Sequence, residues 1–170
     1  MAWQGGMEGG TAAAELLMGI GTPSGKLSDT FAKELADYPS TEGFHESEYF
    51  VHYTEDIYVG YRYFETIPGA KEKVNYPFGF GLSYTEFELE FVNAKQFADE
   101  ISLQVRVTNT GAYEGKEVVQ VYVEAPQGKL MKPAKVLAAF QKTRLLQPGD
   151  SQLLTISFPV RAFASYDDLG

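Results

Sequence analysis

Apolar and polar residues alternate with a period of two through the second half of the chain. The alternation is clearest in Phe87–Phe91, Ile101–Val107, Val119–Val123, Val136–Arg144 and Leu154–Phe158. Antiparallel strands with one buried face produce this pattern. Residues that favour turns separate the stretches, and their spacing favours a small, mainly β fold, an antiparallel β-sandwich. We count about six strands, one fewer than the seven of a complete immunoglobulin-like sandwich.

A stretch rich in aromatic residues and glycine, Asn75–Thr85, precedes the alternating half. Pro77 lacks a backbone donor and fixes its own φ, so no helix runs through this stretch. Gly79 and Gly81 allow a positive φ or the close approach of another backbone. Apolar side chains occupy every second position: Phe78, Phe80, Leu82 and Tyr84. We expect a bent connector with its rings pinned against a neighbouring surface, and Pro77, Gly79 and Gly81 as its structural hinge.

The first 31 residues show helical and turn signals instead of alternation. Trp3–Gly10 contains four glycines and predicts a tight loop, and strong helix formers follow in Thr11–Met18. Thr11 is the expected N-cap and Gly19 the expected stop. A loop followed by a helix is typical of one crossover of an α/β fold. We therefore expect residues 1–31 to be a fragment of an α/β unit.

Residues 21–31 predict a turn followed by a short strand at Lys26–Phe31. The segment Gly21–Leu27 superficially resembles a phosphate-binding loop. The spacing of that motif is wrong here, and Leu27 follows the lysine where the motif needs a hydroxyl. We therefore interpret the segment as structural.

Residues 32–83 form the expected connector, which begins with an acidic, irregular surface loop over residues 32–48. Alternation within Tyr53–Tyr63 predicts a short strand. Arg62 could stack on a tyrosine ring or pair with Glu55 or Asp56, and the ion pair is favoured over contact with a sugar. His45 and His52 lie seven positions apart without a carboxylate at ligand spacing, so a solvent-facing or hydrogen-bonded role is favoured over a metal site.

Charge and composition exclude several classes of function. Fourteen basic and 23 acidic residues give a net charge of −9, which disfavours nucleic acid and anionic membranes as partners. The sequence has no cysteine, so neither disulfides nor thiol chemistry is available. No apolar run approaches the ~18 residues of a membrane span. The segment shows no signal peptide, which favours the bacterial cytoplasm, and neither a cofactor nor a metal is expected.

Several motifs in fixed order resemble family 3 glycoside hydrolases of the β-glucosidase type. Trp3–Gly10, the helix after it and Thr22–Leu27 resemble the end of the family's α/β sandwich domain. Glu55–Phe64 and Tyr76–Thr85 resemble its connector. Three further motifs are similar to its fibronectin type III-like domain: Val107–Gly111, Gly115–Val123 and Leu146–Ser151.

The resemblance implies a retaining enzyme that uses two carboxylates to hydrolyse terminal β-D-glucosyl residues. These enzymes take the nucleophile from a separate barrel domain and usually take the acid/base from an upstream glutamate, so no catalytic residue is expected in this chain. Glu8 does not match the acid/base motif, and hydrogen bonding within its glycine loop is expected instead. Trp3 and Glu8 are the candidates for a place near the substrate. The implied partners are a β-glucoside or oligosaccharide and the remaining domains of the parent enzyme.

The resemblance also divides the chain into residues 1–31, 32–83 and 84–170. In relatives a last sandwich strand follows the region that corresponds to Ser165–Asp167, so we expect that strand to be missing and an open sheet edge to promote self-association. The alternative function is a stand-alone carbohydrate- or protein-binding sandwich module. It requires an exposed aromatic platform, for which Tyr113 and Tyr122 are the candidates.

Overall fold

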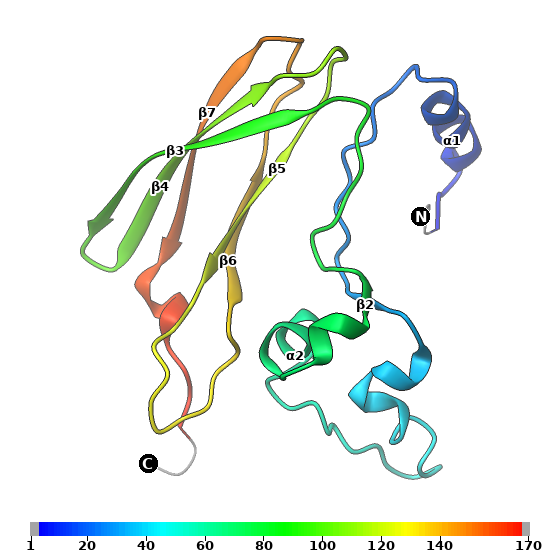
Figure 1. Cartoon of the computed structure of the whole chain (residues 1–170), viewed down its shortest axis with the longest axis vertical. Helices are drawn as coiled ribbons and strands as arrows, with labels where there is room; N and C mark the ends of the chain where they lie inside the picture. Colours follow the sequence, from blue (N-terminus) through cyan, green and yellow to red (C-terminus); the bar gives the residue numbers. More distant parts are fainter. Residues whose placement is uncertain (1–3, 168–170) are drawn as a thin grey trace.

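The computed structural model describes residues 4–167 and has two halves that lie side by side (Figure 1). Five strands make a β-sandwich from the second half of the sequence. Short helices, short strands and extended chain from the first half run along one flank of the sandwich (Figure 1). Within residues 4–167, no helix is long and apolar enough to cross a membrane.

Two antiparallel sheets make up the sandwich. The larger sheet has the order β3-β4-β7, formed by Phe87–Phe97, Glu100–Asn109 and Ser151–Pro159. The smaller sheet pairs β5, Val118–Val123, with β6, Val136–Lys142. A short 3₁₀ helix, η4, follows β7 at Val160–Phe163.

The predicted alternation becomes the core of the sandwich. On β7, Leu154, Ile156 and Phe158 are buried while the residues between them are exposed. Because directly opposed residues of an antiparallel pair share a face, the pairing of Val105 with Leu154 and of Leu103 with Ile156 aligns the apolar rows of β4 and β7. The core cluster consists of Val107, Val119, Leu146, Leu154 and Ile156.

Three details of the strand prediction are wrong. Residues 84–167 form five strands and not six. β3 continues to Phe97, past a register shift between Phe91 and Asn93. It pairs antiparallel with β4 over this whole length, from Phe87 opposite Asn109 to Phe97 opposite Glu100. β6 ends at Lys142, where the Thr143 N–H donates to the carbonyl of Glu117 and its hydroxyl accepts from the Glu117 N–H.

The first half contains short elements. The helix α1 spans Gly9–Leu17 and α2 spans Tyr61–Thr66, while β1, Phe31–Ala32, pairs with β2, Val74–Tyr76. Three 3₁₀ turns complete the first half: η1 at Leu35–Asp37, η2 at Pro39–Thr41 and η3 at Ala70–Lys73. Phe64 of α2 is buried and packs edge-on against the rings of Tyr38 and Tyr63.

The sequence interpretation of α2 is wrong, because Tyr53–Tyr63 does not form a strand. Asp56 and Gly60 both have positive φ, at 49° and 60°, and these values break an extended strand. In the helix, Tyr61 and Phe64 lie three positions apart and share one face. From that face Tyr61 stacks on Phe78, and Phe64 packs against Tyr38.

Two predictions about the first 31 residues also need correction. The strand expected at Lys26–Phe31 is reduced to β1, and most of that stretch is extended chain outside a regular sheet. The helix forms where it was predicted, but it begins at Gly9, so Thr11 lies inside it and Glu8 is the N-cap residue. Gly19 follows the helix with φ +73°, which suits the predicted stop.

Candidate functional site

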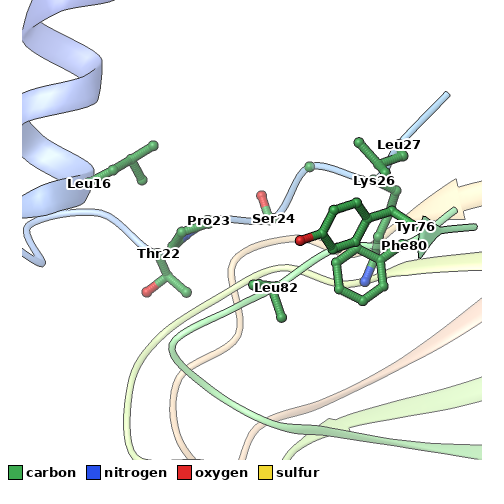
Figure 2. A pocket seen from close by; sticks show the side chains of 11 residues that line it. Leu16, Thr22, Pro23, Ser24, Lys26, Leu27, Tyr76, Phe80 and Leu82 are labelled. Carbon is green, nitrogen blue, oxygen red and sulfur yellow. The ribbon is translucent and has the colours of Figure 1, made fainter. Parts of the chain in front are cut away.

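A groove of about 770 Å³ runs between two extended segments of the first half, Thr22–Leu27 and Tyr76–Leu82. Figure 2 shows the rings of Tyr76 and Phe80 beside the Lys26–Leu27 end of the first segment and Leu16 of α1 at the other end, while the Leu82 side chain points away from that segment. The groove is open to solvent, and Leu82 at its rim is 74% exposed. It is therefore a surface feature and not an enclosed ligand cavity.

Backbone hydrogen bonds hold the two walls of the groove together. The Leu27 N–H donates to the Phe80 carbonyl at 2.8 Å, and the Gly79 N–H donates to the Leu27 carbonyl at 2.8 Å. A Cβ at Gly81 would collide with the carbonyl oxygen of Gly25. The two backbones approach so closely that Gly81 must remain a glycine.

The predicted hinge residues form a turn that rests on the sandwich. The Phe80 N–H donates to the Pro77 carbonyl at 3.0 Å, with Gly79 in the third position of the turn at φ +80°. A type II turn favours glycine there for that reason. A Cβ at Gly79 would also collide with the side-chain amide of Gln120 on β5. These contacts support a structural role for Pro77, Gly79 and Gly81, and their role as a hinge remains a prediction.

Polar contacts connect the first wall of the groove to the sandwich. The Lys26 ammonium lies 2.7 Å from a carboxylate oxygen of Glu117, and both side chains are mostly buried. Lys142 donates from Nζ to the Ser24 carbonyl at 3.1 Å. Ion pairs and hydrogen bonds near the surface contribute little to the free energy of unfolding, so these contacts mainly fix the position of the segment.

A cluster of aromatic rings joins the connector, α2 and the sandwich. Tyr61 of α2 stacks on Phe78 with 4.6 Å between ring centroids and meets the ring of Tyr122 on β5 edge-on at 6.0 Å. Phe80 pairs instead with Tyr76, at 5.2 Å. The expectation that the connector rings are pinned holds for Phe78 and Phe80, but Leu82 and Tyr84 remain exposed.

Tyr122 shows the strongest electrostatic effect in this cluster. Burial, followed by the nearby Tyr61 and Glu65, raises its pKa from 10.0 to about 12. Its hydroxyl donates to Gln120 Oε1 at 2.6 Å, and the ammonium of Lys135 lies 5.3 Å from the ring centroid. Lys135 also pairs with Glu65 at 3.1 Å, which closes the contact between α2 and the sandwich.

The platform needed for the binding-module alternative is not formed by the two predicted tyrosines. Tyr122 packs against Tyr61 within the protein, while Tyr113 is 62% exposed in the turn after β4. A sugar that stacked on both rings would need both of them free, so a strand tyrosine used for packing does not qualify.

The other predicted residues that lie within residues 4–167 do not line the groove. Glu8 is exposed; its carbonyl accepts from the Ala12 N–H at 2.9 Å, and its side chain makes no capping hydrogen bond to the described residues of the helix. Trp3 lies outside the described residues. His52 bonds Glu46 at 2.8 Å, whereas Arg62 forms no ion pair with Glu55 or Asp56 among the pairs seen in residues 4–167.

Sequence reasoning missed the most completely bonded polar side chain, Asn109. It is fully buried at the end of β4; its amide donates to the carbonyls of Tyr113 and Leu146 at 2.7 and 3.0 Å. Its side-chain oxygen accepts from the Thr85 hydroxyl at 2.7 Å and from the Gly111 N–H at 3.1 Å. This residue holds Thr85, the second residue after the connector, against Tyr113 and Leu146 of the sandwich. An Asn-Thr-Gly turn signal was visible in the sequence, but the burial of its first residue was not.

The groove lacks the pair of carboxylates that a retaining glycosidase needs. Its lining contains Lys26 but no aspartate, glutamate or histidine. A retaining glycosidase needs two carboxylates about 5–5.5 Å apart. Within residues 4–167, no three histidine, aspartate or glutamate side chains gather closely enough to hold a metal ion.

The fold is a β-sandwich preceded by short helices and extended segments, and comparison with known proteins identifies the family. The sequence profile of the glycosyl hydrolase family 3 C-terminal domain matches residues 1–84. The fibronectin type III-like domain profile matches residues 117–170. The chain belongs to the family 3 glycosyl hydrolases, as the motifs predicted, and contains the end of one domain and the fibronectin-like fold that follows it.

Similar proteins span the whole chain. Beta-glucosidase A of Butyrivibrio fibrisolvens is 64% identical over 100% of this chain, and a beta-glucosidase of Ruminococcus albus is 51% identical over 99% of it. The solved structure of a beta-glucosidase from Paenibacillus barengoltzii covers 98% of the chain with a TM-score of 0.92 at 57% identity. Beta-glucosidase 3B from Thermotoga neapolitana, solved with glucose, covers 98% with a TM-score of 0.90 at 44% identity.

The chain is a small part of each of these proteins. It spans 22% and 17% of the two relatives, and 18% and 23% of the two solved chains. It corresponds to an accessory region of a β-glucosidase, and the activity of the whole protein is a separate question.

Proposed function

We propose that this chain is a non-catalytic brace within a retaining β-glucosidase that removes terminal β-D-glucosyl residues from β-glucosides or oligosaccharides. The observation that carries the proposal is that the whole chain is similar to a segment of proteins named beta-glucosidase, and that this segment makes up about a fifth of the length of each protein. The groove supports it, because its lining lacks the paired carboxylates that the reaction needs. Those carboxylates belong to other domains of the parent polypeptide, which are the chain's principal partners.

Within this role the proposed division of the chain follows the contacts. Residues 1–31 are the end of the α/β sandwich domain, residues 32–83 are the connector, and residues 84–170 are the fibronectin-like brace. Support comes from Gly81, which lies against Gly25 of the first part, and from Gly79, which lies against Gln120 of the sandwich. Trp3 and Glu8 are proposed to lie on the substrate side of the parent, since they belong to the segment that precedes α1.

The test of the enzymatic proposal compares the 170-residue chain with the parent polypeptide on an aryl β-glucoside. The parent is expected to hydrolyse the glucoside and the isolated chain is expected to be inactive. Hydrolysis by the isolated chain, with contaminating enzyme excluded by a mock purification, would place catalysis here and overturn the proposal. An inactive parent that binds no glucose would remove the β-glucosidase assignment.

We further propose that the isolated chain self-associates through its sandwich. In the larger sheet β3 is an edge strand, and Leu89 and Phe91, whose partners on β4 are Val107 and Val105, are exposed despite lying on the core-facing side. Edge strands with exposed apolar residues template pairing with another chain. Sedimentation across a concentration series tests this, with a downstream-extended chain as the comparison. A short chain that stays monomeric would contradict it.

A further inference from the structure

An exposed loop in the first half, residues 42–59, combines acidic and aromatic residues in an unusual way. We call it the acidic aromatic loop. It contains five carboxylates (Glu42, Glu46, Glu48, Glu55 and Asp56) and neither lysine nor arginine. Seven large apolar side chains in it are exposed: Phe44, Tyr49, Phe50, Val51, Tyr53, Ile57 and Val59. In Figure 1 it runs along the far end of the first half, between η2 and α2.

The loop is folded and not a random tail, so its apolar side chains have a defined outward display. His52 bonds Glu46 at 2.8 Å across the loop, and the ring of His52 packs on Phe50 at 4.9 Å. The Tyr58 N–H donates to the Glu55 carbonyl at 2.8 Å just before the chain enters α2. These contacts give the loop a defined shape, while Tyr49 and Tyr53 stay 92% and 89% exposed.

Such a display predicts a covered surface. Single exposed apolar residues are ordinary, but a cluster rimmed by polar groups marks an interaction site. Tyrosine and phenylalanine are enriched at the centres of interfaces, and the five carboxylates of the loop, which has neither lysine nor arginine, select a partner of opposite charge. The chain spans only about a fifth of its relatives, so most of the parent polypeptide is available to cover the loop.

We propose that the acidic aromatic loop docks onto another domain of the same parent polypeptide, at a surface that is apolar in its centre and carries lysine or arginine at its rim. The inference rests on the proposed function only in assuming a longer parent enzyme. The loop would thereby fasten the connector to that domain, just as the contact of Tyr61 with Tyr122 fastens it to the sandwich.

Hydroxyl-radical footprinting with mass spectrometry tests the docking in the parent and in the 170-residue chain. Tyr49 and Tyr53 are expected to oxidise about tenfold more slowly in the parent, because an interface centre excludes solvent. Tyr113, exposed on the sandwich, is the internal control and should change less. Activity on an aryl β-glucoside, measured on the same parent sample, separates this result from the enzymatic proposal.

A charge reversal provides the second measurement. Glu48→Lys should lower the melting temperature of the parent by several degrees while leaving that of the 170-residue chain unchanged, and the loss should shrink in high salt. Glu88→Lys, an exposed position on β3, is the matched control and should have little effect in either chain.

Three outcomes would overturn the proposal. Equal oxidation of Tyr49 and Tyr53 in both chains would show that no domain covers the loop. Protection that appears in the isolated chain as its concentration rises would identify a second copy as the occupant. Protection that appears only when a soluble β-glucan is added would make the loop a carbohydrate surface.

Discussion

The strand β7 and the helix α1 each contain nine residues but have very different surroundings. Three of the nine residues of β7 are buried at 5% exposure or less, and they contact a core shared by both sheets. Of the nine residues of α1, none is buried in the described part of the chain, and Leu17 is 86% exposed. The Tyr84 hydroxyl connects the helix to the connector through one hydrogen bond to the Leu16 carbonyl, at 2.9 Å.

This difference shows that a correct local pattern does not make a stable element. The α1 sequence favours a helix, and a helix forms, but nine residues are marginal alone in water and need a packed face. The β7 sequence has only ordinary strand propensity, but its apolar row meets β4 and the opposite sheet. Tertiary contacts therefore decide which half of the molecule is stable.

Hydrogen exchange gives the largest expected contrast between the two. Central β4 amides, which pair on both sides, should exchange only through unfolding of the whole sandwich. The α1 amides of Ala12–Leu17 should exchange orders of magnitude faster, because the helix can open by itself. The measurement is mass-spectrometric exchange on a dilute monomer. Strong protection of α1 there would show that the groove contacts stabilise it more than we propose.

The lock at Asn109 should be the most sensitive single position of the sandwich. Asn109→Ala removes four side-chain hydrogen bonds. The Tyr113 carbonyl and the buried Thr85 hydroxyl lose this partner, whereas the Leu146 carbonyl keeps the Gly115 N–H, so we expect a loss of about 3–5 kcal/mol in the free energy of unfolding. Urea denaturation measures it, and Thr110→Ala at the adjacent exposed position is the control. A loss below about 1 kcal/mol would mean that water replaces the missing amide.

Two neighbouring leucines on β7 test the core directly. Leu154 is 1% exposed and Leu153 is 47% exposed, although both lie in the same strand. Leu154→Ala should lower the free energy of unfolding by about 3 kcal/mol through lost burial and a residual cavity. Leu153→Ala should lower it by less than about 1 kcal/mol. Similar losses for both would place the apolar row of β7 on the wrong face.

The sequence predicted the sandwich well because alternation records which strand face is buried. It failed at α2, where four alternating residues between Ile57 and Tyr63 suggested a strand. The positive φ of Asp56 and Gly60 breaks that stretch, and the packing of Phe64 against Tyr38 favours the helix. The alternation of apolar and polar residues along a short segment reveals neither its backbone angles nor its contacts with rings distant in the sequence.

The groove was predicted only in part. Glycine at positions 79 and 81 indicated a special backbone, and the structure places Gly81 against Gly25 and Gly79 against Gln120. The contribution of residues 22–27 as the opposite wall was invisible, because it depends on pairing between segments more than fifty positions apart.

Valine substitutions compare the two glycines with a neutral neighbour. Gly79→Val forces a β-branched residue to φ +80°, and Gly81→Val forces a side chain into the Gly25 carbonyl. Each should lower the free energy of unfolding by about 1–3 kcal/mol. Ser83→Ala removes one long hydrogen bond to the Thr85 N–H, at 3.4 Å, and should have a much smaller effect. Equal melting temperatures for the three variants would remove the argument for a strained connector.

Alkaline pH should weaken the contact between α2 and the sandwich through Tyr122. Its pKa is raised from 10.0 to about 12, mainly by burial and further by Tyr61 and Glu65. Below pH 10 the phenol is protonated in both the folded and the unfolded chain, so its contribution to stability is fully present. Between pH 10 and 12 the unfolded chain loses the proton first, so the free energy of unfolding falls as pH rises. We expect the free energy of unfolding to fall by about 1 kcal/mol through this group, after discounting the pKa shift for the partly exposed ring.

Urea denaturation at pH 9 and pH 11.5 measures this fall for the wild type and for Tyr122→Phe, with Tyr113→Phe as the control that removes an exposed phenol. Tyr122→Phe should flatten the pH dependence and Tyr113→Phe should not; an unchanged slope in Tyr122→Phe would show that other groups govern the alkaline loss.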